Sequence, residues 1–133
     1  MEARKGRGYV YALEYHIVWC TKYRRKVLSG PVEIRLKELL STLAKENETA
    51  ILEMEVMEDH VHLLIQASPQ VFLPTLLKIF KGVSARLLFE EFGSVLKEKL
   101  WDGHLWNPSY FIATVSEQTE SQIRTYIREQ KEA

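Results

Sequence analysis

Apolar and polar residues alternate over short distances in three segments of the chain. Residues 9–19 are aromatic and β-branched with few strand-breaking residues, so they are expected to form a β-strand. Residues 50–57 also alternate, a polar break follows at Glu58 and Asp59, and residues 60–66 form a second apolar run. Two strand-like runs separated by two residues are typical of a β-hairpin.

Two further segments have apolar residues at the spacing of an amphipathic helix. The first begins at Pro31, because proline is tolerated at the first helical position, and is expected to end near Asn47. The second follows Pro69 and is expected to end at about Glu91. Its apolar stripe consists of Leu73, Leu76, Leu77, Phe80, Val83, Leu87 and Leu88.

The last third of the chain is expected to contain a loop-rich stretch, a strand and a helix. The loop-rich stretch covers residues 92–109, and the strand covers residues 110–115. Ser116 is suited to cap a final helix, with residues 118–131 inside it. The elements then follow in the order β-α-β-β-α-β, with one further helix at the end.

This order predicts an α+β fold of the ferredoxin-like or RRM-like type, in which helices cover one face of an antiparallel sheet. The C-terminal helix over residues 117–131, which carries Tyr126, is added to that plan. A length of 133 residues fits one domain, and no internal repeat or linker divides residues 1–133. RNA-recognition motifs share this order, so the fold alone does not decide the function.

The composition narrows the classes of protein to consider. The chain has no run of 18 apolar residues, so no membrane-spanning helix is expected. Residues 1–8 are basic and polar and lack the apolar stretch of a signal peptide. The single cysteine, Cys20, cannot form an internal disulfide, which fits a reducing compartment. A cytoplasmic protein is therefore expected.

The formal net charge is zero, but the charges are distributed unevenly. Residues 1–26 hold seven basic and two acidic groups, whereas the remaining 107 residues hold 11 basic and 16 acidic groups. This asymmetry indicates either a local anionic partner or a solvated basic arm over residues 1–8. The chain lacks a glycine-rich phosphate loop, so no nucleotide cofactor is expected.

Two histidines, His60 and His62, are two residues apart on a predicted strand. Alternate side chains of a strand point to the same face, so both imidazoles are expected on the face opposite Val61, Leu63 and Ile65. That face is the one the helices leave uncovered, where two converging imidazoles can chelate a divalent ion. A solvent-facing pair with no ligand is the alternative.

The final helix offers a second pair, Tyr126 and Gln130, which are four residues apart and share one helix face. The Gln130 amide oxygen can serve as a third metal ligand. A nearby cation would make the Tyr126 phenol a better nucleophile, because its unperturbed pKa is about 10. Alternatively, Tyr126 packs against the sheet and Gln130 is a surface residue. His16 is expected to be a packed group or to add to the metal environment.

Several clusters of basic residues are candidates for phosphate contact. The segment from Lys22 to Lys26 mixes cations with an aromatic ring, as sites for single-stranded nucleic acids do. Lys78 and Lys81 on the second helix can also contact phosphate. Either group can instead belong to a solvated face, which is the favoured interpretation for the two lysines of the helix.

Several separated segments together resemble the HUH (His-hydrophobic-His) transposases with a single catalytic tyrosine. These are the transposase A enzymes of small insertion sequences that move as single-stranded DNA. The resemblance runs from about residue 8 to residue 131. It is carried by EYHIVWCTKYRRKVL, MEVMEDHVHLLI, the pair KG with SAR on the long helix, LWNPSYFIATV, and YIREQ.

The resemblance implies the roles of four residues. His60, His62 and Gln130 would hold Mg²⁺ or Mn²⁺, and Tyr126 would attack a scissile phosphate. The products would be a 5′-phosphotyrosine link and a free 3′-hydroxyl, and a second 3′-hydroxyl would later rejoin the strand. The resemblance also implies a homodimer that recognises DNA hairpins at element ends, with the tyrosine helix in either subunit's site. By position, the DNA contacts would be Lys22, Tyr23, Arg24, Arg25, Lys78, Lys81 and Arg86.

Three other functions stay open at this point. A domesticated relative would cleave hairpins at dispersed repeats without moving an element of its own. A non-catalytic RRM-like domain would bind nucleic acid through exposed aromatic residues and would hold no metal at His60 and His62. A protein with a purely structural metal is the remaining alternative.

Overall fold

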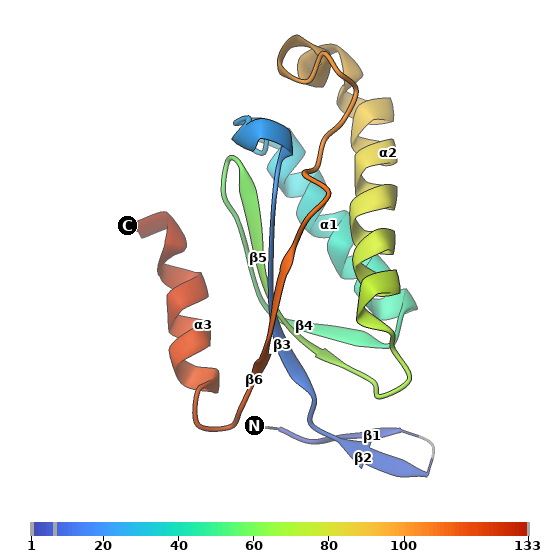
Figure 1. Ribbon diagram of the computed structural model, residues 1–133, viewed down its shortest axis with the longest axis vertical. Coiled ribbons are helices and arrows are strands. Elements are labelled where there is room, and N and C mark those ends of the chain that lie inside the picture. Colours follow the sequence, from blue (N-terminus) through green and yellow to red (C-terminus); the bar gives the residue numbers. More distant parts are fainter. Residues whose placement is uncertain (1, 7, 133) are drawn as a thin grey trace.

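An antiparallel sheet of four strands forms the centre of the molecule (Figure 1). The computed structural model describes residues 2–6 and 8–132. The strands lie in the order β4-β5-β3-β6. Their bounds are Glu14–Cys20 for β3, Thr49–Val56 for β4, His60–Ala67 for β5 and Phe111–Val115 for β6. With the two helices that connect them, the strands form the predicted β-α-β-β-α-β fold.

Two helices, α1 (Pro31–Glu46) and α2 (Leu73–Lys99), cover one face of the sheet, and α3 (Glu120–Arg128) lies on the other (Figure 1). Helix α1 begins and ends as predicted, after Gly30, whose φ of 58° lies in the left-handed region that glycine adopts easily. Within residues 2–6 and 8–132, no helix combines the length and apolar character needed to cross a lipid bilayer.

The main core lies between the sheet and the pair α1 and α2. Its centre is Trp19, which stacks on Phe80 and meets Trp106 edge-on, with ring centroids 6.2 Å and 5.8 Å away. The β5 residues that alternate with the two histidines are fully buried in this core; they are Val61, Leu63 and Ile65. The prediction that these residues face the core is therefore confirmed.

The predicted strand over residues 9–19 is wrong, because the chain forms two strands there. Residues Tyr9–Tyr11 form β2, which pairs with β1 (Arg4–Gly6) in a separate two-stranded sheet. Strand β3 starts only at Glu14, which pairs with Gln66, one residue before its partner β5 ends at Ala67. Met1, Arg7 and Ala133, which belonged to the predicted arm and domain bounds, lie outside the described residues.

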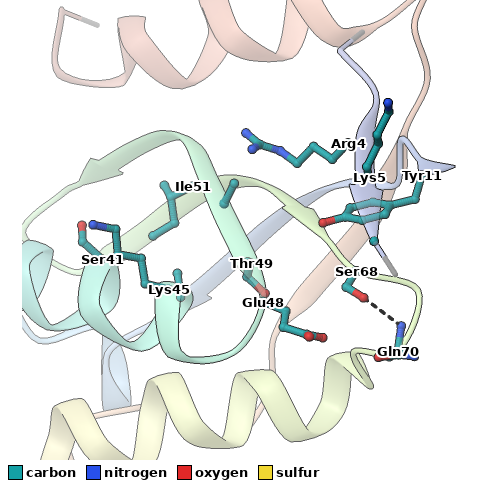
Figure 2. Close-up of a pocket in the computed structure, with 13 residues that line it drawn as sticks. Arg4, Lys5, Tyr11, Ser41, Lys45, Glu48, Thr49, Ile51, Ser68 and Gln70 are labelled. Atoms are coloured by element: carbon teal, nitrogen blue, oxygen red, sulfur yellow. Dashed lines mark hydrogen bonds between the residues drawn. The ribbon is translucent and has the colours of Figure 1, made fainter. Parts of the chain in front are cut away.

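The hairpin of β1 and β2 borders a surface hollow of about 910 Å³, and another hollow, of about 290 Å³, lies between α2 and the segment at Pro108 and Tyr110. Figure 2 shows Arg4 and Lys5 on one side of the first hollow and Lys45 of α1 on the other. No residue predicted to perform the chemistry lines this hollow. The size of a cavity therefore does not locate the functional site in the described part of this chain.

Two predicted helix boundaries are also wrong. Helix α2 continues past Glu91 to Lys99, across a non-helical residue at Phe92, because the fully buried Leu96 extends its apolar face. The final helix starts at Glu120 rather than directly after Ser116, whose carbonyl accepts hydrogen bonds from the backbone of Thr119 and Glu120 in a preceding turn. It ends at Arg128, and a short 3-10 helix, η2 (Glu129–Glu132), follows.

Helix α3 covers part of the sheet face that was predicted to be open. Ile127 is fully buried there and forms a small second core with Leu64 of β5 and Val115 of β6. Leu52 and Ile123 pack against the same cluster. The face is closed because α3 is amphipathic and buries its apolar side, Ile123 and Ile127, against this cluster.

Ion pairs surround this small core. Glu53 of β4 accepts hydrogen bonds from Arg124 (3.5 Å) and Arg128 of α3. Beyond the helix, the Lys131 ammonium lies 2.7 Å from Glu33 of α1. Pairs at the surface contribute roughly 0–1 kcal/mol each, so together they orient α3 more than they stabilise it.

One buried carboxyl opposes this docking. Glu14 of β3 is 3% exposed, and its Oε1 atom has no hydrogen-bond partner among the described residues. Burial and, to a smaller extent, the nearby Glu120 carboxyl raise the pKa of Glu14 to about 6, against the opposing effect of Arg124. The protein therefore carries a buried carboxylate at neutral pH beneath the first turn of α3.

We expect Glu14→Gln to stabilise the protein at neutral pH. The folded-state pKa of about 6 lies above the ordinary value of 4.5, so stability is lost as pH rises through this interval. The difference between these two pKa values corresponds to about 2 kcal/mol of unfolding free energy at pH values above both. Urea unfolding at pH 7 is expected to show the variant to be more stable than the wild type, and the difference is expected to shrink towards pH 4.5.

The matched control is Glu53→Gln, which weakens the pairs with Arg124 and Arg128 and is expected to destabilise the protein at pH 7. Equal or lower stability of Glu14→Gln relative to the wild type at pH 7 would contradict the interpretation of Glu14.

Candidate active site

Strand register gathers three histidines on the sheet face that α3 covers. His62 of β5 pairs with Val18 of β3, and His16 of β3 pairs with Leu64. Residues paired across an antiparallel sheet point to the same side, so His16, His60 and His62 all lie opposite the main core. The predicted orientation of His60 and His62 is present in the structure.

The His62 imidazole contacts the rings of both other histidines. The ring centroids of His60 and His62 are 4.9 Å apart. The Nε2 atom of His16 lies 3.3 Å from Nδ1 of His62, and the two rings are stacked. His16, which was expected either to pack or to join the metal environment, is buried and belongs to this cluster.

Tyr126 is the residue of α3 that reaches the histidines. Its ring centroid is 5.6 Å from that of His62 and 5.9 Å from that of His16, with both imidazoles edge-on to the phenol. The docking of Ile127 sets this position, because the neighbouring residue is buried while Tyr126 remains 50% exposed. The phenol is therefore accessible from solvent.

The buried imidazoles are neutral at physiological pH. Burial, together with the smaller effects of the neighbouring His60 and His16, lowers the pKa of His62 to about 4. Burial also lowers the pKa of His16. A neutral imidazole keeps a lone pair on one ring nitrogen, which is the form that binds a metal.

Asp59 orients His60 and was missed by sequence reasoning, which treated it only as part of the hairpin break. Its carboxylate lies 2.6 Å from Nδ1 of His60 and 3.1 Å from Nε of Arg24. Burial alone raises the pKa of Asp59, but these two hydrogen bonds outweigh it and hold the pKa below its usual value. With Nδ1 of His60 engaged, Nε2 is the atom left for a metal. The signal in the sequence was an acidic residue directly before the histidine pair.

Gln130 lies farther along the chain, in η2 rather than in α3. Its side-chain nitrogen donates a hydrogen bond to the Tyr126 carbonyl at 3.1 Å. In the part of the chain that the structure describes, no hydrogen bond joins Gln130 to His60 or His62, and no three His, Cys, Asp or Glu side chains are arranged to hold a metal ion. The structure therefore brings together two of the three predicted ligands, His60 and His62, whereas the third, Gln130, is bonded to the backbone of Tyr126.

The first group of predicted DNA contacts lies beside this site. Lys22, Tyr23 and Arg24 form the short 3-10 helix η1 (Lys22–Arg24), and Arg25 follows it. Arg24 reaches the site directly through its ion pair with Asp59.

The second group lies on α2, on the other side of the sheet. Lys81 donates hydrogen bonds to the carbonyls of Asn107 (2.6 Å) and Ser109 (3.2 Å), and burial lowers its pKa. Arg86 forms an exposed ion pair with Glu90 of the same helix, and Lys78 is exposed. The structure does not bring Lys78, Lys81 or Arg86 together with the histidines.

The chain is similar to known transposases over nearly all of its length. A family model described as "Transposase IS200 like" matches residues 9–130. The ISDra2 transposase TnpA of Deinococcus radiodurans is 55% identical over 130 residues, which cover 98% of this chain and 92% of that protein. The transposases for insertion sequence element IS200 of Salmonella typhimurium and Salmonella typhi are each 34% identical over 119 residues, covering 90% of this chain and 77% of theirs.

Solved structures agree with these relatives. A crystal structure of a protein from Deinococcus radiodurans R1, described as a transposase, superimposes with a TM-score of 0.78 at 50% identity, covering 96% of this chain and 97% of the other. A REP-associated tyrosine transposase bound to a REP hairpin shares the fold, with a TM-score of 0.67 at 13% identity over 99% of this chain and 75% of the other. Because the family model and the curated relatives span most of the sequence, the chain belongs to the family of IS200-like transposases.

Proposed function

We propose that this transposase cleaves and rejoins single-stranded DNA at element ends, with Tyr126 as the nucleophile and a divalent metal held by His60, His62 and Gln130. The observation that supports the proposal best is the position of the Tyr126 phenol, within 6 Å of the His62 and His16 rings and half exposed to solvent. A nucleophile needs this combination of adjacent activating groups and open access to the phosphate.

The proposed chemistry exchanges one phosphodiester for another. The Tyr126 oxygen forms a bond to the scissile phosphorus and loses its proton, while the bond from phosphorus to the 3′-oxygen breaks and that oxygen leaves as a hydroxyl. A 3′-hydroxyl from another strand end then attacks the 5′-phosphotyrosine, and the phenol is released. Bond energy is conserved in the intermediate, so the reaction requires no nucleotide cofactor.

The ligands fit a divalent ion through their chemistry. His60 and His62 each have Nε2 available, because their Nδ1 atoms face Asp59 and His16. The Gln130 amide oxygen is the proposed third ligand, since its nitrogen is the atom engaged with Tyr126. Bound there, Mg²⁺ or Mn²⁺ would stabilise negative charge on the phosphate and the phenolate; imidazole ligands favour manganese.

The proposed substrate is a DNA hairpin with unpaired flanking nucleotides. The REP-associated relative is bound to a hairpin, and Lys22, Tyr23, Arg24 and Arg25 lie beside the histidines of this chain. Lys78, Lys81 and Arg86 would contact only DNA that continues around the sheet onto α2. The homodimer implied by the family remains part of the proposal, although one chain already brings Tyr126 to its own histidines.

A non-catalytic RRM-like domain fits the same sheet less well. Such a domain would present aromatic rings at the centre of the open face. Here the centre holds His16 and His62, and the exposed Phe111 lies on the edge strand β6. The domesticated relative would share all the proposed chemistry, and it differs only in whether an element is moved.

We expect Tyr126→Phe to abolish covalent attachment to DNA while leaving DNA binding intact, since only the nucleophilic oxygen is removed. Labelled hairpin DNA and manganese are incubated with each variant, and denaturing electrophoresis detects the protein–DNA adduct. Tyr15→Phe removes a hydroxyl from the core side of β3 and is expected to keep the adduct. An adduct formed by Tyr126→Phe would exclude this nucleophile.

His62→Ala is expected to abolish both cleavage and tight manganese binding, because it removes one of two adjacent imidazoles. Calorimetric titration with manganese measures the binding independently of the reaction. The matched control, His104→Ala, changes an exposed histidine outside the cluster and should alter neither quantity. Unchanged metal affinity in His62→Ala would refute the proposed ligand set.

Gln130→Ala tests the third ligand alone. If the amide oxygen binds the ion, the manganese concentration for half-maximal cleavage is expected to rise by about tenfold, an effect comparable to loss of one supporting group at a metal site. Glu129→Ala, one residue earlier, is the control and should leave the manganese requirement unchanged. An unaltered requirement in Gln130→Ala would remove Gln130 from the ligand set and leave the histidines in place.

A further inference from the structure

Two large aromatic side chains are exposed at the end of the sheet where His60 lies. Tyr23 is 66% exposed and Trp101 is 73% exposed. The Arg25 guanidinium carbon lies 5.3 Å from the centroid of each ring, and the Lys22 ammonium lies 5.4 Å from the Tyr23 ring. We call Tyr23, Arg25 and Trp101 the aromatic platform.

The platform is held in place by hydrogen bonds to backbone carbonyls. Arg25 donates to the Lys99 carbonyl at the end of α2 (2.6 Å), and the Lys99 ammonium donates to the Lys26 carbonyl (3.1 Å). Thr21 donates from its hydroxyl to the Arg25 carbonyl at 2.7 Å. The loop after β3 and the end of α2 are thus joined from both sides, so Arg25 stays near both rings.

The backbone holds Tyr23 out of the core at a cost. Tyr23 and Arg24 have φ angles of 55° and 54°, in the left-handed region that side chains other than glycine rarely adopt. Two consecutive residues in this conformation persist only where the surroundings enforce it, and such residues concentrate at functional sites. In this backbone conformation the Tyr23 ring is exposed to solvent and lies outside the main core.

The platform also adjoins the proposed active site. The Thr21 backbone nitrogen donates to the Asp59 carbonyl at 2.9 Å, and Val27 and Leu28 donate to the Glu58 carbonyl. Figure 1 shows η1 beside the tip of the β4–β5 hairpin, near the end of α2. Since Asp59 also holds the ring of His60, the loop that carries Tyr23 is connected to the metal ligand through one residue.

The side chains of the aromatic platform indicate the class of ligand that it can bind. Exposed π-faces interleaved with cations attract a polymer that carries both flat apolar rings and negative charge, which describes single-stranded nucleic acid. Interfaces between proteins are also rich in tyrosine, tryptophan and arginine, but they are depleted in lysine, and here the Lys22 ammonium lies over the Tyr23 ring. A DNA duplex has its base faces covered by stacking, so it can offer the platform only phosphates.

We propose that Tyr23, Arg25 and Trp101 stack on unpaired bases of the DNA strand next to the phosphate that Tyr126 attacks. The platform would hold the strand by stacking and would favour unpaired over paired nucleotides at this position. This inference rests on the proposed function and extends it to Trp101, which no motif indicated.

Trp101 provides a direct probe of stacking, because the other two tryptophans, Trp19 and Trp106, are buried. The Tyr126→Phe protein, which is expected to bind DNA without cutting it, is titrated with a hairpin that carries unpaired flanking thymidines. We expect tryptophan fluorescence to be quenched, and to stay unquenched in the same protein carrying Trp101→Phe. A duplex of equal length is expected to leave the fluorescence largely unchanged.

Affinity gives the second measurement. Stacking contributes about 1–3 kcal/mol per base, so Trp101→Ala is expected to weaken binding of the flanked hairpin by roughly tenfold or more. Binding of the duplex should change by less than about twofold, and Trp101→Phe should retain most of the affinity because it keeps a ring. Val95→Ala, an exposed apolar residue of α2, is the matched control.

Several results would overturn the platform. These are unchanged affinity for the flanked hairpin in Trp101→Ala, an equal loss for hairpin and duplex, or absence of quenching. A change of oligomeric state in Trp101→Ala without a change in DNA affinity would assign the surface to a second copy of the chain.

The two proposals fail separately. If the wild-type protein forms the adduct and Trp101→Ala binds DNA normally, only the platform is excluded. If quenching occurs but the wild-type protein forms no adduct, the platform stands and the catalytic proposal falls.

Discussion

The packing of Ile127 between Leu64 and Val115 is the contact on which the candidate site depends. The histidines lie on rigid paired strands, but Tyr126 belongs to a nine-residue helix that is joined to the sheet only by side-chain contacts among the described residues, such as those of Ile127 and the ion pairs with Glu53. A helix of that length is not stable alone in water, so its position comes from tertiary contacts. Burial of one isoleucine is worth a few kcal/mol, enough to seat the helix and set the direction of the adjacent phenol.

Charged contacts of α3 also affect its position on the sheet. Glu53 attracts Arg124 and Arg128, and Lys131 bridges to α1, whereas the buried carboxyl of Glu14 opposes the first turn. Helix α3 is therefore held on the sheet by a small apolar cluster and by ion pairs at the surface. The main core does not extend to this side, so the two sides of the sheet differ in role: one stabilises the fold, and the other arranges the chemistry.

Sequence patterns predicted the fold and the histidine face because both follow from local periodicity. Alternation alone put His60 and His62 opposite Val61, Leu63 and Ile65. It did not reveal that β3 begins only at Glu14, since strand length depends on the partner strand, nor that α2 continues past Phe92. The position of α3 on the histidine face and the role of Asp59 depend on contacts between distant segments, which no local pattern contains. Helical spacing did relate Gln130 to Tyr126, but the tightening of the last turn into a 3-10 helix altered where its amide lies.

The left-handed backbone conformation at Tyr23 and Arg24 lowers the stability of the fold. The same conformation exposes the Tyr23 ring, which is proposed to bind DNA. Non-glycine residues in this conformation cost about 1 kcal/mol or more each. Glycine at position 23 would relieve that strain and would also remove the ring from the surface. A search for more stable versions of this protein would therefore tend to select changes that erase its aromatic surface, and thermal stability alone would be a misleading measure of improvement.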